Sequence, residues 1–254
     1  MSADLDLELG LDLELALALA DVADAIALPR FRAVDLRIET KPDLTPVTDA
    51  DRAVERALRE RLERERPGEG VLGEEEGDSG GSTRWIIDPI DGTKNFSRGI
   101  PVWATLIALE RDGVVVCGVA SAPALGHRWW AARGEGAFRD GERLHVSKVA
   151  SVADAVMSFS RSGLRDVRTL ELARRVWHAQ GFSDFWAHLL VAEGSVDIAV
   201  EHVMHPWDNA VLQVVVEEAG GRFTDLRGNP RHDGGSAVTT NGLLHDEVLA
   251  QLNR

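Results

Sequence analysis

The sequence predicts a mixed α/β protein in two lobes, and three observations along the chain support this prediction. Helical patterns dominate the first 65 residues, strand patterns fill residues 84–147, and strands alternate with helices after about residue 150. The change near residue 150 is one of pattern, without a flexible linker. We therefore expect one domain over residues 1–254, with an N-terminal α+β lobe (about 1–150) and a C-terminal α/β lobe (about 151–254).

The first segment carries two conflicting signals. Leucine alternates with acidic or small residues over positions 4–19, and strict alternation is typical of a strand. The alanine content and the length favour a helix instead, starting near Leu11 and ended by Pro29. A short strand over 36–40 and a loop with two prolines over 41–46 are expected to follow.

Residues 49–65 predict an amphipathic helix, because apolar side chains recur at helical spacing among many charged ones. The apolar face consists of Val54, Leu58 and Leu62. Asp49 is expected to be the N-cap, and Pro67-Gly68 should end the helix. The arginine and glutamate side chains of this helix are expected to face solvent.

The remaining elements follow from the periods of the apolar residues. Strands are expected over 85–88, 102–110, 114–121, 127–132, 156–160 and 196–201, with hairpin turns at Asp112-Gly113 and Asp140-Gly141. Helices are expected over 164–180, 184–193, 206–219 and 243–252, with two short strands before the last helix and a loop over 77–82.

Composition narrows the classes of function. The net charge of −14 argues against general nucleic-acid binding, which needs a basic surface. The single cysteine, Cys117, lies in an apolar run and leaves no intrachain disulfide, which fits a reducing cytoplasm. The first residues lack the basic segment of a signal peptide, and no apolar run is long enough to span a membrane. We expect a cytoplasmic protein with neither nucleic acid nor membrane as partner.

The most informative stretch is Trp85–Phe96, in which Asp88 and Asp91 end a strand as apolar as Trp-Ile-Ile. Desolvated carboxylates must be paired or bind a metal, and hard oxygen ligands suit Mg²⁺. If a helix starts at Gly92-Thr93, its free backbone N–H groups would bind phosphate. Adjacent metal and phosphate sites imply chemistry on phosphate esters.

Three further acids stand out by context, and each has a purely structural alternative. Asp51 lies near the start of the helix over 49–65, where it could simply complement the helix dipole. Glu74 opens an acidic cluster that could be a solvated loop. Asp208 lies in the first turn of the helix over 206–219, where it could be a capping acid.

Three motifs together resemble the inositol monophosphatase superfamily. They are Gly73-Glu74-Glu75, Asp88-Pro89-Ile90-Asp91-Gly92-Thr93-Lys94-Asn95-Phe96 and Trp207-Asp208-Asn209-Ala210. Their order and spacing also match, and the similarity runs from about residue 10 to the end. The resemblance implies a layered αβαβα sandwich of the inositol monophosphatase/fructose-1,6-bisphosphatase type, usually a homodimer. It also implies a Mg²⁺-dependent phosphatase.

The resemblance assigns roles by position. The metal ligands would be Glu74, Asp88, the carbonyl of Ile90, Asp91 and Asp208, around two or three Mg²⁺ ions, with Mn²⁺ as an alternative. Asp51 matches a Thr-x-x-Asp element of the family and would act with Thr93 and Glu74 to orient and deprotonate the attacking water. The backbone of Gly92 and Thr93 would hold the phosphate of a small phosphate monoester.

Within the superfamily, the chain is most similar to the histidinol-phosphatases of bacterial type. This similarity lies in residues 41–51, 98–103, 121–125, 128–134 and 240–245, whereas His202–Pro206 departs from the branch. It predicts hydrolysis of L-histidinol phosphate to L-histidinol, a late step in histidine biosynthesis.

The substrate branch also suggests three contacts for the part of the substrate beyond its phosphate. Glu201 and Asp184 match family positions near the substrate, and acids there would suit an ammonium and an imidazole. Asp184 could equally be the N-cap of the helix over 184–193. Asn241 is the third candidate.

Two other functions remain as alternatives. A broad inositol or sugar phosphatase would use the same metal site, and Glu201 could equally line a polyol. A non-catalytic regulatory scaffold would keep only the fold. The complete set of mutually repelling acids argues against the scaffold, because a retired site has no physical need for them.

Overall fold

The structure is a computed structural model that describes residues 3–160, 162–182 and 184–254. The chain forms two compact units, Met1–Ala132 and Arg133–Arg254. In the part of the chain that is described, no helix is both long and apolar enough to cross a membrane.

The first unit ends at Ala132, whereas the sequence pattern changes near residue 150. The residues in between are held to the second unit by Glu218. Its carboxylate accepts the backbone N–H groups of Gly134 at 3.1 Å and Gly136 at 3.0 Å. The hairpin over these residues therefore belongs with the helix that carries Glu218, although its sequence continues the strand-rich pattern.

Helix α1 (Ala3–Arg30) spans the whole first segment of the described chain, so the expected start near Leu11 is wrong. An alternating sequence also repeats every four residues, which is the spacing of one helix face, and the helical alternative prevails. Pro29 lies inside the last turn instead of ending the helix. The buried face consists of Leu15, Ala16, Leu19, Ala20, Ala23 and Ala27.

Helix α2 (Asp49–Glu65) has the predicted bounds, and its apolar face is buried as expected. The expected N-cap is wrong: Thr48 caps the helix and Asp49 does not. Thr48 has extended backbone angles, and its hydroxyl accepts the N–H groups of Ala50 and Asp51, while its own N–H donates to the Asp51 carboxylate. Asp49 instead pairs with Arg30 at 2.8 Å.

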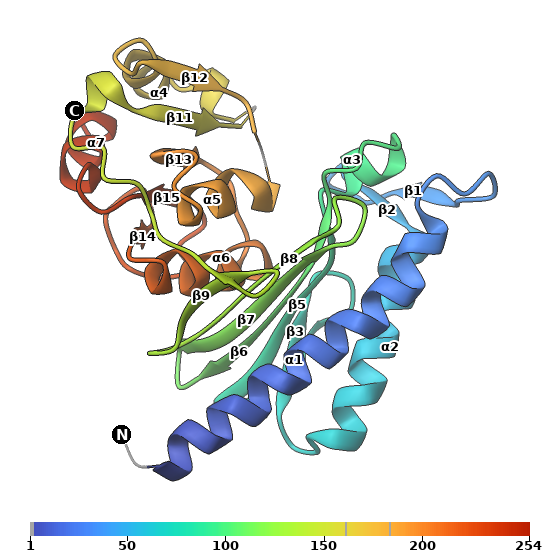
Figure 1. The fold of residues 1–254 in the computed structure, drawn as a ribbon. Helices are drawn as coiled ribbons and strands as arrows, with labels where there is room; N and C mark the ends of the chain where they lie inside the picture. Colours follow the sequence, from blue (N-terminus) through green and yellow to red (C-terminus); the bar gives the residue numbers. More distant parts are fainter. Residues whose placement is uncertain (1–2, 161, 183) are drawn as a thin grey trace. The chain divides into compact units, whose positions relative to one another are not determined.

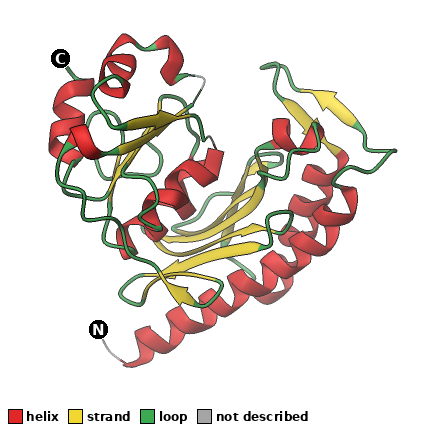
Figure 2. Cartoon of the chain, turned by 45° about the horizontal axis from the view of Figure 1, so that its top comes forward, coloured by secondary structure: helices red, strands yellow, loops and turns green. Residues whose placement is uncertain are grey.

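The first unit is a sheet covered on one face by α1 and α2, which lie side by side in Figures 1 and 2. Its strands are β3 (Gly70–Gly73), β4 (Gly77–Asp78), β5 (Thr83–Asp91), β6 (Ala104–Arg111), β7 (Val114–Ala122) and β8 (His127–Ala132), in the order β8-β7-β6-β5-β3-β4. Only β3 and β5 run parallel; the other neighbours are antiparallel. A separate ribbon pairs β1 (Ile38–Thr40) with β2 (Pro46–Thr48).

Several short strands of this unit were not predicted from the sequence. β2 begins at Pro46, the last residue of the expected loop, and β4 occupies the start of the loop expected over 77–82. Both have three residues or fewer, which is too short for a pattern of apolar residues to show in the sequence. They are strands because they pair with a neighbouring strand.

The second unit has helices on both faces of a five-stranded sheet. The strands are β11 (Val156–Phe159), β12 (His178–Gln180), β13 (Ile198–Glu201), β14 (Arg222–Thr224) and β15 (Ala237–Thr240), in the order β12-β11-β13-β15-β14. The helices are α4 (Val167–Ala173), α5 (Asp184–Ala192), α6 (Pro206–Glu218) and α7 (His245–Leu252). Met157, Ile198 and Val200 pack toward α4 and α7, whereas Ala199 packs toward α5. A hairpin of β9 (Gly136–Arg139) and β10 (Glu142–Arg143) precedes the sheet.

The helix expected over 164–180 is wrong for most of its length. A 3-10 turn over Gly163–Arg165 precedes α4, which ends at Ala173, and the chain then forms edge strand β12. β12 pairs in parallel with β11, with His178 opposite Val156. Sheet pairing here overrides a segment of good helix formers, because tertiary contacts outweigh intrinsic propensity.

The layers agree with the predicted fold class. The first unit contributes a helix layer and a sheet layer. The second contributes a helix layer, a sheet and a second helix layer. These are the kinds of layer that an αβαβα sandwich contains.

Candidate active site

The two aspartates of the central motif lie at the end of β5. Asp88 is opposite Leu106 of β6 and Asp91 is opposite Ala104, so three steps along β5 face two along β6. This extra residue is a β-bulge, held by the Thr105 hydroxyl, which donates to the Pro89 carbonyl at 2.8 Å. Without a bulge, residues three apart would point to opposite faces of the sheet. Here the carboxylates of Asp88 and Asp91 have oxygens within 4.8 Å of each other.

A short helix begins directly after these aspartates, so the condition set for phosphate binding is met. Helix α3 (Thr93–Ser97) is preceded by Gly92 in a left-handed conformation, with φ 85°. A Cβ on this residue would also approach the Val102 carbonyl to 3.0 Å, so glycine is required twice over. Asn95 donates to the same carbonyl at 2.8 Å and fixes the turn. The first N–H groups of such a helix have no acceptor within it and can bind an anion.

Asp51 lies against this turn. The Thr93 hydroxyl is 3.2 Å from Asp51 Oδ1 and 3.0 Å from the Ile90 carbonyl, two acceptors for its single proton. The other oxygen, Oδ2, accepts from Thr48 N at 2.8 Å and Thr48 Oγ1 at 2.5 Å. Burial raises the Asp51 pKa to about 6, and the hydrogen bonds from Thr48 oppose that rise. The structure therefore joins Asp51 and Thr93, and the capping interaction is present as well.

Glu74 follows β3, and its N–H donates to the Ile87 carbonyl of β5 at 3.2 Å. Its carboxylate and that of Glu75 share one cation: Lys41 Nζ is 2.8 Å from Glu74 and 2.6 Å from Glu75. Burial raises the Glu75 pKa to about 7, and the hydrogen bond from Lys41 opposes the rise. Glu74 thus belongs to an ordered acidic group, in which Lys41 was not foreseen from the sequence.

Glu55 of α2 is the second residue that the sequence analysis missed. It was expected on a solvated face, but its side chain is fully buried. Its carboxylate accepts the backbone N–H groups of Glu75 and Glu76 at 2.8 and 2.9 Å, and the Arg59 guanidinium at 2.9 Å. A Cβ on Gly73 would lie 2.0 Å from this carboxylate, so the small residue admits it. The available signal was its position beside the buried Val54.

Glu201 interacts electrostatically with two other acids of the second unit. Glu201 at the end of β13 is 5% exposed; burial raises its pKa to about 8, with further contributions from the charges of Asp184 and Asp208. Asp208 lies in the first turn of α6, where its Oδ2 accepts the His205 N–H at 2.7 Å. The capping interaction considered for Asp208 is thus present. Asp184 is the first residue of α5 and has φ 58°.

Asn241, the third candidate substrate contact, is held inside the second unit. Its amide donates to Ser147 Oγ at 2.9 Å and to the Val149 carbonyl at 2.8 Å, and its oxygen accepts from Leu244 N at 3.3 Å. These bonds give Asn241 a structural role, and its contact with substrate stays a prediction.

The segment His202–Pro206 is anchored by its two histidines. His202 Nε2 lies 2.8 Å from Thr169 Oγ1, and the His205 ring stacks on Trp207 with centroids 4.8 Å apart. The segment thus ties β13 to α4 and to the start of α6 through side-chain contacts.

The donor atoms of these residues fit a hard divalent cation. Asp88 is 2% exposed, and its carboxylate lies beside that of Asp91 at the end of an apolar strand. Two close, buried like charges are unfavourable without a cation, and carboxylate and carbonyl oxygens are the ligands that Mg²⁺ prefers. The Ile90 carbonyl lies between them in sequence and is a further hard oxygen atom, which accepts the Thr93 hydroxyl at 3.0 Å.

Comparison with known proteins agrees with this chemistry. The profile of the Inositol monophosphatase family matches residues 11–254. A histidinol-phosphatase of Mycobacterium tuberculosis is 60% identical over 92% of this chain and 95% of its own length. One of Streptomyces coelicolor is 50% identical over 92% of this chain and 94% of its own.

Solved structures agree in fold. An IMPase of Thermotoga maritima has a TM-score of 0.87 at 32% identity and covers 95% of this chain and 96% of its own. An inositol monophosphatase of Zymomonas mobilis has a TM-score of 0.86 at 32% identity, with full coverage of both chains. The predicted sandwich fold, the resemblance seen in three motifs and the phosphatase class are confirmed. The chain belongs to the Inositol monophosphatase family.

Proposed function

We propose that this protein is a Mg²⁺-dependent phosphomonoesterase that hydrolyses L-histidinol phosphate to L-histidinol and phosphate. The similarity to histidinol-phosphatases at 60% and 50% identity, over almost the whole chain, carries the choice of substrate. The paired aspartates at the bulge of β5 support the metal-dependent reaction.

The metal would be held by oxygen ligands alone. We assign Glu74, Asp88, the Ile90 carbonyl, Asp91 and Asp208 as ligands of two or three Mg²⁺ ions, with Mn²⁺ as an alternative. Bound Mg²⁺ would neutralise the phosphate, acidify a water and stabilise the leaving alkoxide. Lys41 must share or release Glu74 when the metal binds, because its ammonium now occupies one oxygen of that carboxylate.

Asp51 and Thr93 would move the proton. The Thr93 hydroxyl already donates toward Asp51 Oδ1 at 3.2 Å, so its oxygen can accept a proton from the attacking water while its own proton passes to Asp51. The bonds from Thr48 hold Asp51 in this orientation. The backbone N–H groups of Gly92 and Thr93 would bind the phosphate oxygens.

The other end of the substrate would meet the acids of the second unit. Glu201 and Asp184 are close enough for their charges to interact, and a cation between them would relieve that repulsion. The ammonium and imidazole of histidinol phosphate supply such charge, whereas a neutral polyol does not. Asn241 remains the weakest of the assigned contacts because its side chain has internal partners.

An inositol monophosphatase is the second candidate. A fructose-1,6-bisphosphatase/inositol-1-monophosphatase of Thermotoga maritima is 36% identical over 82% of this chain. The same metal chemistry would serve a polyol phosphate, and only the acids around Glu201 would discriminate.

Phosphate release from L-histidinol phosphate tests the proposal. We expect turnover that requires Mg²⁺, stops with a chelator and returns when Mg²⁺ is restored. Turnover that is unaffected by the chelator would overturn the metal mechanism. No turnover of this substrate beside rapid hydrolysis of myo-inositol 1-phosphate would overturn the substrate assignment. The homodimer and the cytoplasmic location also stay predictions. Light scattering tests whether the protein is a dimer.

A further inference from the structure

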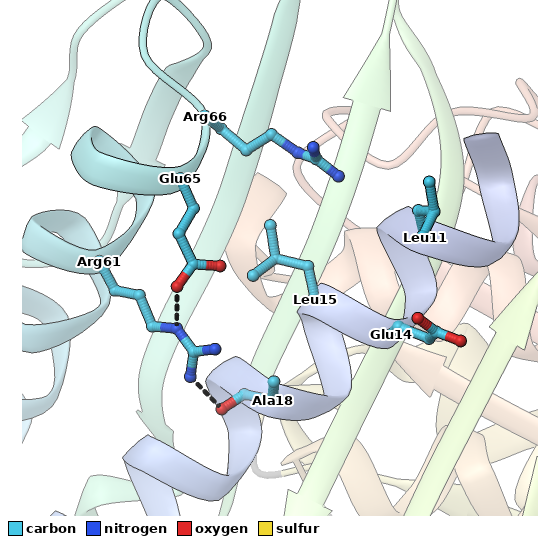
Figure 3. A pocket seen from close by; sticks show the side chains of 7 residues that line it. All are labelled: Leu11, Glu14, Leu15, Ala18, Arg61, Glu65 and Arg66. Carbon is cyan, nitrogen blue, oxygen red and sulfur yellow. Dashed lines mark hydrogen bonds and ion pairs between the residues drawn. The ribbon is translucent and has the colours of Figure 1, made fainter.

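The two arginines that line the pocket drawn in Figure 3, between α1 and the end of α2, already have partners. Arg61 donates to Glu65 at 2.8 Å and to the Ala18 carbonyl at 2.9 Å, and Arg66 donates to Asp12 at 2.9 Å. These contacts hold α1 against α2. A buried contact elsewhere in the first unit, on β6, bears on the assigned metal site instead.

Thr105 is a polar residue in an apolar strand. It lies in β6 and is fully buried, and the other residues from Trp103 to Leu109 are tryptophan, alanine, leucine and isoleucine. A buried hydroxyl costs free energy unless it forms a hydrogen bond, and valine would fill the same space without that cost. What the hydroxyl provides is its bond to the Pro89 carbonyl, at 2.8 Å.

This bond holds one end of the peptide group between Pro89 and Ile90. The other end is held by Asp88, because the Ile90 N–H donates to Asp88 Oδ1 at 3.0 Å. The peptide group is planar, with its C=O and N–H pointing in opposite directions. The bond from Thr105 to the C=O therefore fixes the direction of the N–H, and the N–H in turn fixes the orientation of the Asp88 carboxylate.

The two ends of this peptide group reach opposite faces of the sheet. Thr105 lies on the same face of β6 as Ile107, which packs in the apolar cluster formed with α1 and α2. Asp88 follows Ile87, a member of the same cluster, so its side chain points away from these helices. The peptide group thus stands across the sheet at the bulge, whereas the peptide groups of a regular strand lie in its plane.

We propose that Thr105 is a positioning residue that raises the affinity of Asp88 and Asp91 for a divalent cation. The inference rests on the proposed function, which assigns both aspartates as metal ligands. Without the hydroxyl, the buried Pro89 carbonyl loses its donor and the peptide group is free to turn. The Asp88 carboxylate then loses its fixed orientation, and ordering it costs part of the free energy of metal binding.

Mn²⁺ titration of the metal-free, full-length protein tests the proposal, with free Mn²⁺ measured by electron paramagnetic resonance. Thr105→Val keeps the shape of the side chain and removes the hydroxyl. We expect its Mn²⁺ affinity to fall about 10–100-fold, the usual effect of removing a residue that orients a metal ligand. Thr105→Ser keeps the hydroxyl and should bind Mn²⁺ within about threefold of the unaltered protein.

The matched control is Thr224→Val, in the second unit. Thr224 is 1% exposed, and its hydroxyl donates to the Asp225 carbonyl at 2.8 Å and lies beside His245. The control thus loses a buried bond of the same kind and length, but one that orients no assigned metal ligand. Its Mn²⁺ affinity should equal that of the unaltered protein, even though its stability falls.

Mg²⁺ activation provides a second measurement. In Thr105→Val, the Mg²⁺ concentration for half-maximal activity should rise by the same factor as the Mn²⁺ dissociation constant. The kcat at saturating Mg²⁺ should change by less than about threefold, because the ligands themselves are intact. If Thr105→Val does not fold, Thr105→Ala removes the hydroxyl with a smaller side chain, and the same weakening is expected.

Three results would overturn the inference while leaving the proposed function intact. They are an unaltered Mn²⁺ affinity in folded Thr105→Val, an equal weakening in Thr224→Val, and a failure of Thr105→Ser to restore binding. An unaltered protein that binds no Mn²⁺ would overturn the metal mechanism as well. Because the titration needs no substrate, a wrong choice of phosphate ester leaves its result unchanged.

Discussion

At the scale of single residues, the bulge of β5 is the feature on which the metal site depends. It brings the carboxylates of Asp88 and Asp91 within 4.8 Å, at the end of a strand whose preceding side chains are buried. The sequence was sufficient to select both residues, because acids after an apolar run require compensation. Lys41 and Glu55 were missed because the acids and backbone N–H groups that they bind in this site lie 20 or more residues away in the chain.

Asp91→Asn should abolish turnover while the protein stays folded. The amide keeps the shape of the side chain but removes a negative charge from the metal ligands, so we expect kcat/KM to fall by about 100-fold or more. Repulsion from Asp88 also disappears, so metal-free stability should not fall. Phosphate release and urea unfolding of the metal-free protein check the two parts. Near-full activity would remove Asp91 from the ligand set.

Asp184→Ala should impair histidinol phosphate more than inositol phosphate. The carboxylate lies near Glu201 and would bind the ammonium, which a polyol phosphate lacks. We expect kcat/KM to fall by about tenfold more for the cationic substrate, the loss of one charge-assisted contact. Steady-state kinetics with both substrates decide the matter. Equal losses would mean that Asp184 does not recognise the ammonium.

At the scale of elements, the structure departs from expectation where pairing or capping replaces propensity. The segment over 164–180 contains good helix formers, yet part of it becomes β12 because β11 offers an unpaired edge. Thr48 replaces Asp49 as the cap because Asp51, three residues later, completes the reciprocal bonds. Long elements such as α2 and β7 were predicted nearly to the residue, since their apolar periods span many turns or pairs.

The junction between α2 and the loop after β3 yields a test at this scale. Gly73→Ala would place a Cβ 2.0 Å from the Glu55 carboxylate, which must then release the loop that carries Glu74. We expect a loss of about 1–3 kcal/mol in the free energy of unfolding, together with weaker Mg²⁺ activation.

The matched control for that substitution is Gly10→Ala, in α1, where a Cβ would meet nothing within 4 Å. This change should stabilise the protein by about 0.5–1 kcal/mol and leave Mg²⁺ activation unaltered. Chemical unfolding and Mg²⁺ titration of both variants provide the comparison. Equal stability of the two variants would show that Glu55 does not need the space above Gly73.

At the scale of the whole molecule, stability should depend on buried neutral histidines of the second unit. His245 lies between the hydroxyls of Thr224 and Thr240, both at 3.0 Å, and burial lowers its pKa to about 4. The unfolded chain binds this proton near pH 6.5, whereas the folded chain does not. Stability should therefore fall as the pH drops from about 6.5 to about 4.

His245→Gln isolates this contribution. Over that pH range, each such histidine lowers the free energy of unfolding by about 1.4 kcal/mol per pH unit. The variant should start less stable at pH 7 but lose stability less steeply on acidification. Urea unfolding of metal-free protein at pH 7, 6 and 5 measures both slopes. Parallel curves would show that His245 is protonated in the folded state.

For the whole enzyme, we expect one metal-assisted site, with its substrate specificity set by the acids of the second unit. The direct test is the ratio of kcat/KM for L-histidinol phosphate to that for myo-inositol 1-phosphate, measured with Mg²⁺ on the same preparation. We expect a ratio well above about 10, because at least one charged contact is available only to the cationic substrate. A ratio at or below one would contradict this specificity and assign the protein to general polyol phosphate hydrolysis.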